Sequence, residues 1–221
     1  EFIVNASGGY LNFSALSEWL SKSVMELEPL GDKKEVLIEH TSANPNGPFH
    51  VGRARNAILG DTLVRLNRLF GNKVRAEYYV DDMGKQVGVL AWALENLSKE
   101  EVDDILGDED SINPRWKGKK DHEIVRWYQA AQSLRSANVS EEIESAIGKL
   151  VHASEHGDNS VLSQFEEAYK PVLDGMLETL SRLGIEFDTF TKESKFVVDG
   201  SVAELMERLE ELDIHQVADN G

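Results

Sequence analysis

Hydrophobic residues follow two spacings along this chain, and the spacing predicts the type of each element. Apolar positions at helical spacing predict helices, which we expect over 14–28, 50–70, 84–97, 121–137, 140–155, 160–183 and 201–212. Alternating or β-branched apolar runs predict strands over 35–40, 73–80 and 214–217, and two short strands around a turn over 1–13. We expect short strands or extended pieces over 186–190 and 196–198. The segment 99–120 is polar, and we expect it to be irregular.

The order strand, helix, strand over residues 35–80 predicts a parallel βαβ unit and an α/β fold with a Rossmann-like sheet. In the connecting helix, the large apolar residues share one stripe, which we expect to face the sheet. They are Val51, Ala54, Ile58, Leu59, Leu63, Leu66 and Leu69.

Two polar loops leave the carboxyl ends of these strands, over 41–49 and 81–84. The first contains Pro and Gly and leads directly into the helix that begins near His50. Parallel sheets bind ligands beyond these strand ends, and the start of a helix attracts anions. The sequence therefore predicts that both loops line one site with a place for phosphate.

The residues of these loops resemble a known family. ANPNGPFHVGR over 43–53 resembles the first signature of the class I aminoacyl-tRNA synthetases, and its surroundings resemble arginyl-tRNA synthetase. EYYVDDMGKQVG over 77–88 is a second match to that family. The resemblance implies the first half of the catalytic domain, with an incomplete nucleotide-binding sheet and a mostly helical insertion.

The resemblance also divides the chain into four parts. Residues 1–31 resemble the end of an N-terminal domain with a linking helix, and 32–98 the first half of the Rossmann-like domain. We expect 99–159 to be the helical insertion and 160–221 the continuation of the catalytic domain.

By this resemblance, His50 and Arg53 are the catalytic residues, and Arg53 replaces the usual second histidine of the signature. The residues implied to bind ATP are Ala43, Asn44, Pro45, Gly47, Pro48, His50, Gly52 and Arg53. Those implied to bind arginine are Glu39, Ser42, Asn44, Asp82 and Gln86. Ser42 and Asn44 could instead stabilise turns, and Asp82 could cap the helix that follows it.

The activity implied is the joining of arginine to its tRNA through arginyl-adenylate, with ATP and Mg²⁺ as substrate and tRNA(Arg) as partner. The second phosphate-binding signature of the class is absent, so we expect this segment alone not to charge tRNA. Two alternatives stay open. One is another class I synthetase or nucleotidyl transferase, and the other is a synthetase-like module that only binds partners.

Composition narrows these possibilities. The net charge of −17 argues against a surface that coats nucleic acid, yet residues 32–86 hold nine basic and seven acidic residues and are locally cationic. There is no cysteine, which excludes disulfides and thiolate zinc sites, and we expect no zinc. No apolar run is long enough to cross a membrane, and we expect a cytoplasmic protein without membrane partners.

Two further patterns carry weaker predictions. The segment PRWKGKK over 114–120 could contact RNA or form an ordinary surface loop. His152 and His156 lie one helical turn apart, a spacing that suits a metal, but exposed histidines are common on helices and we expect no metal there.

Overall fold

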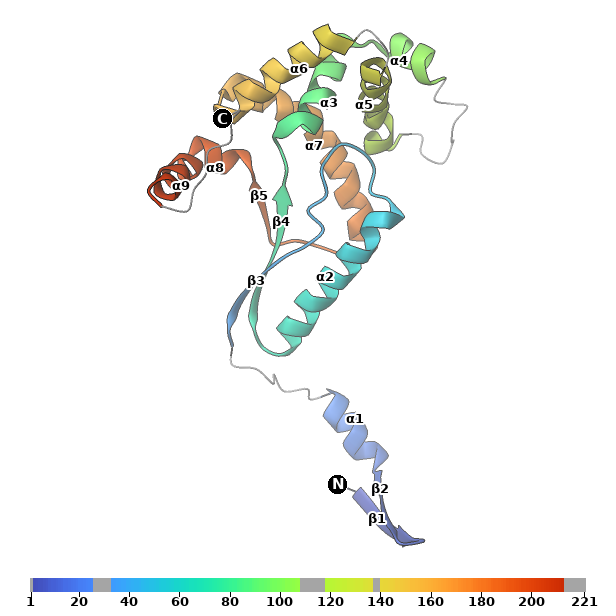
Figure 1. Cartoon of the computed structure of the whole chain (residues 1–221). Helices are drawn as coiled ribbons and strands as arrows, with labels where there is room; N and C mark the ends of the chain where they lie inside the picture. Colours follow the sequence, from blue (N-terminus) through green and yellow to red (C-terminus); the bar gives the residue numbers. More distant parts are fainter. Residues whose placement is uncertain (1, 26–32, 108–117, 137–139, 213–221) are drawn as a thin grey trace.

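The computed structural model describes residues 2–25, 33–107, 118–136 and 140–212. Its body is a short parallel sheet with helices along one side and across its carboxyl edge (Figure 1). The sheet has the order β3-β4-β5, with β3 over Glu35–Glu39, β4 over Lys73–Val80 and β5 over Thr189–Lys192. Helix α2, over Val51–Leu69, connects β3 to β4. The predicted α/β class and parallel βαβ unit are confirmed.

The chain begins with a hairpin and a helix that lie apart from this body in Figure 1. Strands β1 (Phe2–Ser7) and β2 (Tyr10–Ala15) pair antiparallel, as predicted, and α1 covers Ser17–Met25. Gly8 and Gly9 form the turn between the strands with φ of 59° and 84°. A two-residue hairpin turn of this hand needs two positive φ angles, which glycine adopts without strain.

Four helices pack together beyond the carboxyl edge of the sheet (Figure 1). They are α3 (Gly84–Asn96), α5 (Lys120–Ser136), α6 (Ser140–Glu155) and α7 (Asn159–Arg182). Helix α7 contacts α3 and α5, and the main core lies between these helices and β4. The large side chains of this core that solvent does not reach include Tyr78, Leu90, Phe165, Val172, Met176 and Leu180.

Two short helices differ from the sequence prediction, and a third agrees with it. Helix α4 (Lys99–Leu106) lies in the segment predicted as irregular, and a capping box between Ser98 and Glu101 starts it. Helix α8 (Ser194–Val198) replaces the extended piece predicted over 196–198. Helix α9 (Ser201–Glu210) forms as predicted. The strand predicted over 214–217 lies outside the described residues.

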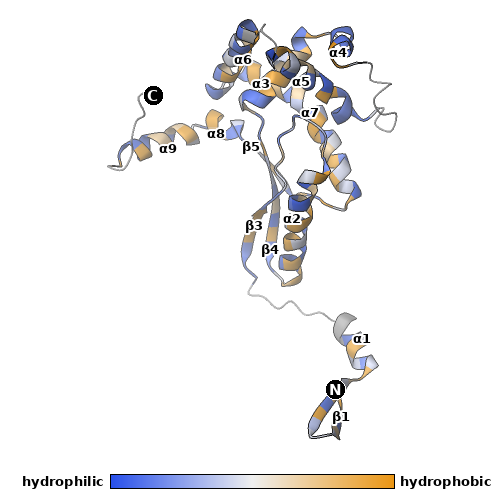
Figure 2. Ribbon diagram, turned by 45° about the vertical axis from the view of Figure 1, so that its right-hand side comes forward, coloured by the Kyte–Doolittle hydropathy of each residue, from blue (hydrophilic) through white to orange (hydrophobic). Residues whose placement is uncertain are grey.

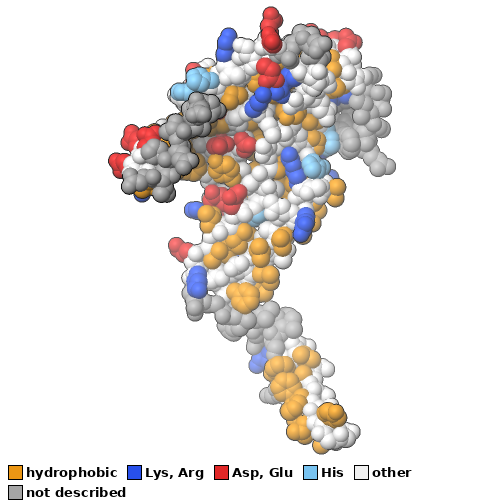
Figure 3. All heavy atoms as spheres, viewed as in Figure 1, with side chains coloured by type: hydrophobic (Ala, Val, Ile, Leu, Met, Phe, Trp, Pro, Cys, Tyr) orange, Lys and Arg blue, Asp and Glu red, His pale blue; other side chains and the backbone are white. Residues whose placement is uncertain are grey.

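The prediction for the buried face of α2 was wrong. The residues buried on this helix are Ala57, Gly60 and Val64, whereas Leu63 and the other large apolar residues are about half exposed or more. A Cβ on Gly60 would lie 2.2 Å from the Cβ of the buried His40, so the helix packs too close to the sheet for large side chains. The large residues therefore face outward, and Figure 3 shows hydrophobic surface over this part of the molecule.

Hydrophobic and hydrophilic residues alternate along α2 and along the helices of the cluster (Figure 2). The main core joins hydrophobic residues of α3 and α7, whereas the large hydrophobic residues of α2 are exposed. The helical cluster is thus the main core, and it supports the loops at the carboxyl edge of the sheet.

Candidate active site

The loop after β3 begins with a sharp change of direction. Thr41 and Ser42 adopt φ of 70° and 35°, a region that residues other than glycine rarely occupy. The Ser42 N–H donates to the carbonyl of His40 at 2.9 Å, and the Ser42 hydroxyl accepts from the Tyr79 N–H at 3.1 Å. Strained backbone of this kind is often found at functional sites. Here it turns the chain from the strand into the loop that carries the first signature.

The side chain of Tyr78 in β4 makes two hydrogen bonds to this loop. Its hydroxyl donates to the Ala43 carbonyl at 2.7 Å and accepts from the Ala43 N–H at 3.1 Å. Tyr78 is inaccessible to solvent, and burial raises the pKa of its hydroxyl to about 12. The hydroxyl therefore keeps its proton at physiological pH and satisfies both backbone groups of one loop residue.

Side chains alternate along the loop between the protein interior and the open side. Ala43, Pro45 and Gly47 are buried, whereas Asn44 and Asn46 between them are half exposed. A Cβ on Gly47 would lie 2.9 Å from Cγ2 of Val125, so the loop packs against α5. Of the residues predicted to bind ATP, Pro45 and Gly47 thus support the loop.

The exposed amides of the loop meet the second motif. Gln86 of α3 accepts with Oε1 from the Asn44 amide at 3.1 Å and from the Asn46 amide at 2.7 Å. Arg53 of α2 donates to the Asn44 carbonyl at 3.2 Å and to Oδ1 of Asn46 at 3.4 Å. The structure therefore brings together Asn44, Arg53 and Gln86, which come from both motifs.

The start of α2 is open to solvent. His50 is the N-cap in an extended conformation, and its Nδ1 accepts from the Gly52 N–H at 3.2 Å. Since Nδ1 accepts, the neutral ring carries its proton on Nε2. His50, Val51 and Gly52 are all exposed, with Val51 at 90%. A Cβ on Gly52 would lie 3.0 Å from the His50 ring, so a larger residue would disturb this cap.

The carboxyl edge of the sheet also holds a group of acidic side chains. Asp81 follows β4 and Glu193 follows β5, and these two carboxyl groups share a hydrogen bond. Burial raises the pKa of both groups. The carboxylates of Asp81 and Asp82 raise the pKa of Glu193 further, whereas the hydrogen bond with Glu193 lowers the pKa of Asp81. Burial and the nearby carboxylates, Glu39 among them, also raise the pKa of Tyr79. In Figure 3, acidic side chains gather near this end of β4 and β5.

Asp82 has a different environment from its neighbour. It is buried, and its two carboxylate oxygens accept from the backbone N–H of Ser194 at 2.9 Å and from the Ser194 hydroxyl at 2.6 Å. The carboxylate therefore fixes the start of α8. The helix after Asp82 has Met83 as its N-cap without a side-chain bond, so Asp82 does not cap α3.

Comparison with known proteins agrees with these motifs. The family model described as tRNA synthetases class I (R), catalytic domain, matches residues 15–220. The chain belongs to this arginyl-tRNA synthetase family. Among curated relatives, the arginine–tRNA ligase of Methanocella arvoryzae is 41% identical over 217 residues, which are 94% of this chain and 36% of the relative. The arginine–tRNA ligase of Archaeoglobus fulgidus is 36% identical over 215 residues, which are 94% of this chain and 36% of the relative.

Solved structures give the same assignment. The arginyl-tRNA synthetase of Thermus thermophilus aligns with a TM-score of 0.64 and 28% identity, over 96% of this chain and 32% of that chain. A putative arginyl-tRNA synthetase from Campylobacter jejuni aligns with a TM-score of 0.54 and 25% identity, over 90% and 40%. The chain spans about a third of the length of the curated relatives it matches.

The synthetase motifs identified some of these residues from sequence but missed others. Asn46, Tyr78, Asp81 and Glu193 lie at the site and were not predicted. Asn46 and Asp81 stand within the matched motifs, beside residues that were chosen. Glu193 was missed because the extended piece that corresponds to β5 was predicted over 186–190. Strand β5 ends at Lys192 and places the next residue at the edge of the sheet. Tyr78 gave no signal beyond its apolar position in a strand.

The structure describes part of the two remaining sequence patterns, the histidine pair and the basic segment. His152 and His156 stack with ring centroids 4.1 Å apart, and among the described residues no group of three His, Cys, Asp or Glu side chains could hold a metal. Residues 114–117 of the basic segment lie outside the described ranges. Lys119 pairs with buried Asp121 at 2.6 Å and donates to Thr179 of α7 at 2.9 Å, so it stabilises the fold.

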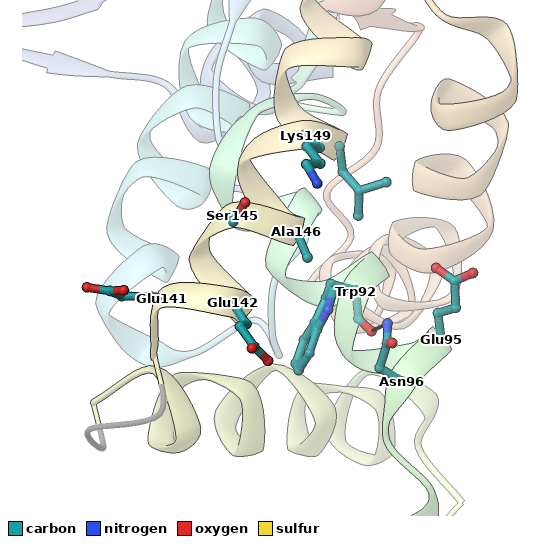
Figure 4. Close-up of a pocket in the computed structure, with 9 residues that line it drawn as sticks. Trp92, Glu95, Asn96, Glu141, Glu142, Ser145, Ala146 and Lys149 are labelled. Carbon is teal, nitrogen blue, oxygen red and sulfur yellow. Dashed lines mark hydrogen bonds between the residues drawn. The ribbon is translucent and has the colours of Figure 1, made fainter.

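A separate groove of about 710 Å³ lies between α3 and α6 (Figure 4). Trp92 and Glu95 line it from α3, and Glu142 and Lys149 line it from α6. It contains none of the residues predicted to bind ATP or arginine. Within the described ranges, no helix has the length and apolar character needed to cross a membrane.

Proposed function

We propose that this chain forms the ATP- and arginine-binding part of an arginine–tRNA ligase. The observation that carries the proposal is the meeting of Asn44, Arg53 and Gln86 beside the exposed start of α2. Side chains separated by 42 residues are joined there by direct hydrogen bonds, at the edge of the sheet where such folds bind ligands.

The triphosphate of ATP fits the start of α2. The first backbone N–H groups of a helix lack partners within the helix and carry a partial positive charge. The proton on Nε2 of His50 adds an exposed donor, and the positive charge of Arg53 is not neutralised by an acidic residue in the first turn. These groups suit an anion. Mg²⁺ would arrive with ATP, bound by phosphate oxygens, and would neutralise part of their charge.

The guanidinium group of arginine fits the acidic edge. Glu39, Asp81 and Glu193 follow or end three neighbouring strands, and burial raises the pKa of the last two because it disfavours their charged forms. A cation placed between these carboxylates would offset that cost. Ser42 and Asp82, which the family resemblance also implies, would then support this edge through Tyr79 and Ser194.

The reaction needs alignment more than a nucleophile. A carboxylate oxygen of arginine attacks the α-phosphorus of ATP, the bond to the β-phosphate oxygen breaks, and pyrophosphate leaves with the bonding electrons. A ribose hydroxyl of tRNA(Arg) then attacks the carbonyl carbon of the adenylate and releases AMP. Donors at the start of α2 would stabilise charge on the transferred group, and no covalent bond to the protein forms. We expect this reaction of protein synthesis to take place in the cytoplasm.

Pyrophosphate exchange into ATP, measured on the complete protein that contains this sequence with tRNA present, tests the proposal. We expect exchange that depends on arginine. A His50→Gln change should lower the rate roughly 100-fold, as loss of one transition-state donor does. The matched control His156→Gln removes an exposed histidine from the turn that follows α6 and should leave the rate unchanged. Exchange that requires another amino acid would refute the assignment.

A further inference from the structure

The four side chains around the loop form a closed ring of hydrogen bonds. The Oε1 of Gln86 accepts from both asparagine amides, and the Asn44 carbonyl accepts from Arg53 at 3.2 Å and from the Asn46 N–H at 2.9 Å. Arg53 closes the ring at Oδ1 of Asn46. The planar guanidinium presents two N–H groups in a fixed fork, so one residue can hold both neighbours at once.

The ring fixes the orientation of the two amides that face the open side. Oε1 of Gln86 already accepts hydrogen bonds within the ring, so its Nε2 remains as a donor for a ligand. The amide nitrogen of Asn44 already donates within the ring, so Oδ1 of Asn44 remains as an acceptor for a ligand. Neither of these remaining atoms has a hydrogen-bond partner in the described part of the chain. An acceptor beside a donor matches the ammonium and the carboxylate of an α-amino acid.

We propose that Arg53 and Asn46 are positioning residues for the amino-acid substrate. They hold the amides of Asn44 and Gln86 in the orientation that binds an α-amino acid, and Arg53 attracts the ATP phosphates through its charge and not through a direct hydrogen bond. The inference rests on the proposed function, since it assigns these residues to the arginine half of that site. Without the ring, each amide can rotate and exchange its donor for its acceptor, which lowers affinity for the amino acid.

Arg53→Lys in the complete protein separates the two roles, because lysine keeps the positive charge but has no fork. Lysine also binds phosphate well as a point charge. We expect the KM for arginine in pyrophosphate exchange to rise about tenfold, the size expected for losing one hydrogen bond to a charged group. The KM for ATP should stay within about twofold, since the charge at the helix start is unchanged. The matched control is Arg55→Lys, at an exposed arginine two residues further along α2, which should change neither constant.

A second variant tests whether Asn46 acts with Arg53. Asn46→Ala should raise the KM for arginine by a similar factor, and the double variant should be no worse than the poorer single variant, because both changes open the same ring. Multiplied effects would show separate roles and overturn the pairing. An unchanged KM for arginine in Arg53→Lys, or an equal change for ATP, would overturn the positioning role.

These outcomes are distinguishable from failure of the proposed function. If the unaltered protein shows no arginine-dependent exchange, the proposed function fails. If exchange is normal but Arg53→Lys affects only ATP, the proposed function stands and this inference fails. The rate of amide hydrogen exchange at residues 44–47, measured without substrates, independently reports how firmly the ring holds the loop. Arg53→Lys should raise this rate, and Arg55→Lys should leave it unchanged.

Discussion

Replacing Tyr78 by phenylalanine tests how the signature loop is held. The change removes one hydroxyl and leaves two backbone groups of Ala43 without their partner, at a residue only 8% exposed. A hydrogen bond contributes about 1 kcal/mol net, and a buried group left without a partner costs about 1–3 kcal/mol. We therefore expect the free energy of unfolding to fall by about 2–3 kcal/mol, and part of the loss to appear as local opening of the loop.

Urea denaturation of the Tyr78→Phe protein measures the global effect, and amide hydrogen exchange measures the local one. An opening easier by that amount speeds exchange at Ala43 roughly 30- to 150-fold. The control is Tyr128→Phe. Among the described residues, the Tyr128 hydroxyl accepts only from Gln132, one turn away on a partly exposed helix face. This substitution should cost less than about 1 kcal/mol and leave exchange at Ala43 unchanged.

The pH dependence of the free energy of unfolding is a second test of the contact between Tyr78 and Ala43. The pKa of Tyr78 is about 12 in the folded protein, above its ordinary value of 10.0, because burial favours the neutral form. The contribution of the neutral Tyr78 hydroxyl to the free energy of unfolding is therefore fully present below pH 10 and is lost as pH rises through 12. The Tyr78→Phe protein should not show this loss. If Tyr78→Phe unfolds like the unaltered protein and keeps the alkaline loss, the loop is not held by this hydroxyl.

Three further predictions address packing and charge. Gly60→Ala should destabilise the protein by at least about 2 kcal/mol through overpacking, whereas Gly148→Ala, where nothing lies within 4 Å, should stabilise it by up to about 1 kcal/mol; thermal denaturation measures both. Val64→Ala should lower the free energy of unfolding by about 2 kcal/mol in urea denaturation, and Leu63→Ala should lower it by less. The opposite order would support the buried face of α2 that the sequence predicted. Burial raises the pKa of Glu193 above its ordinary value of 4.5, so the carboxyl destabilises the fold as pH rises through the raised value. Glu193→Gln should therefore raise Tm at pH 7 and have little effect below pH 4.5, and an equal effect at both pH values would contradict this.

Local signals made part of the site predictable from sequence. The strand before the loop, the Pro/Gly loop and the helix start at His50 all lie within twenty residues, and each has its own residue pattern. Gln86 could be placed near them because parallel strands end at the same edge. These predictions needed only the order of neighbouring elements.

Contacts that depend on three-dimensional packing were not predictable in this way. A helical stripe of large apolar residues does not reveal that the smaller stripe at Ala57, Gly60 and Val64 faces the sheet. The bonds from Tyr78 to Ala43 and from Asp82 to Ser194 join residues 35 and 112 positions apart. Both follow from strand register and from the true end of β5, which the sequence pattern placed too early.

The decisive experiment is a crystal structure of the complete protein with arginine and a non-hydrolysable ATP analogue. We expect the triphosphate over the first turn of α2, beside His50, with the α-amino acid group against Asn44 and Gln86. We also expect the guanidinium at the acidic edge near Glu39 and Glu193. Phosphates bound elsewhere, or arginine bound away from these amides, would contradict this arrangement.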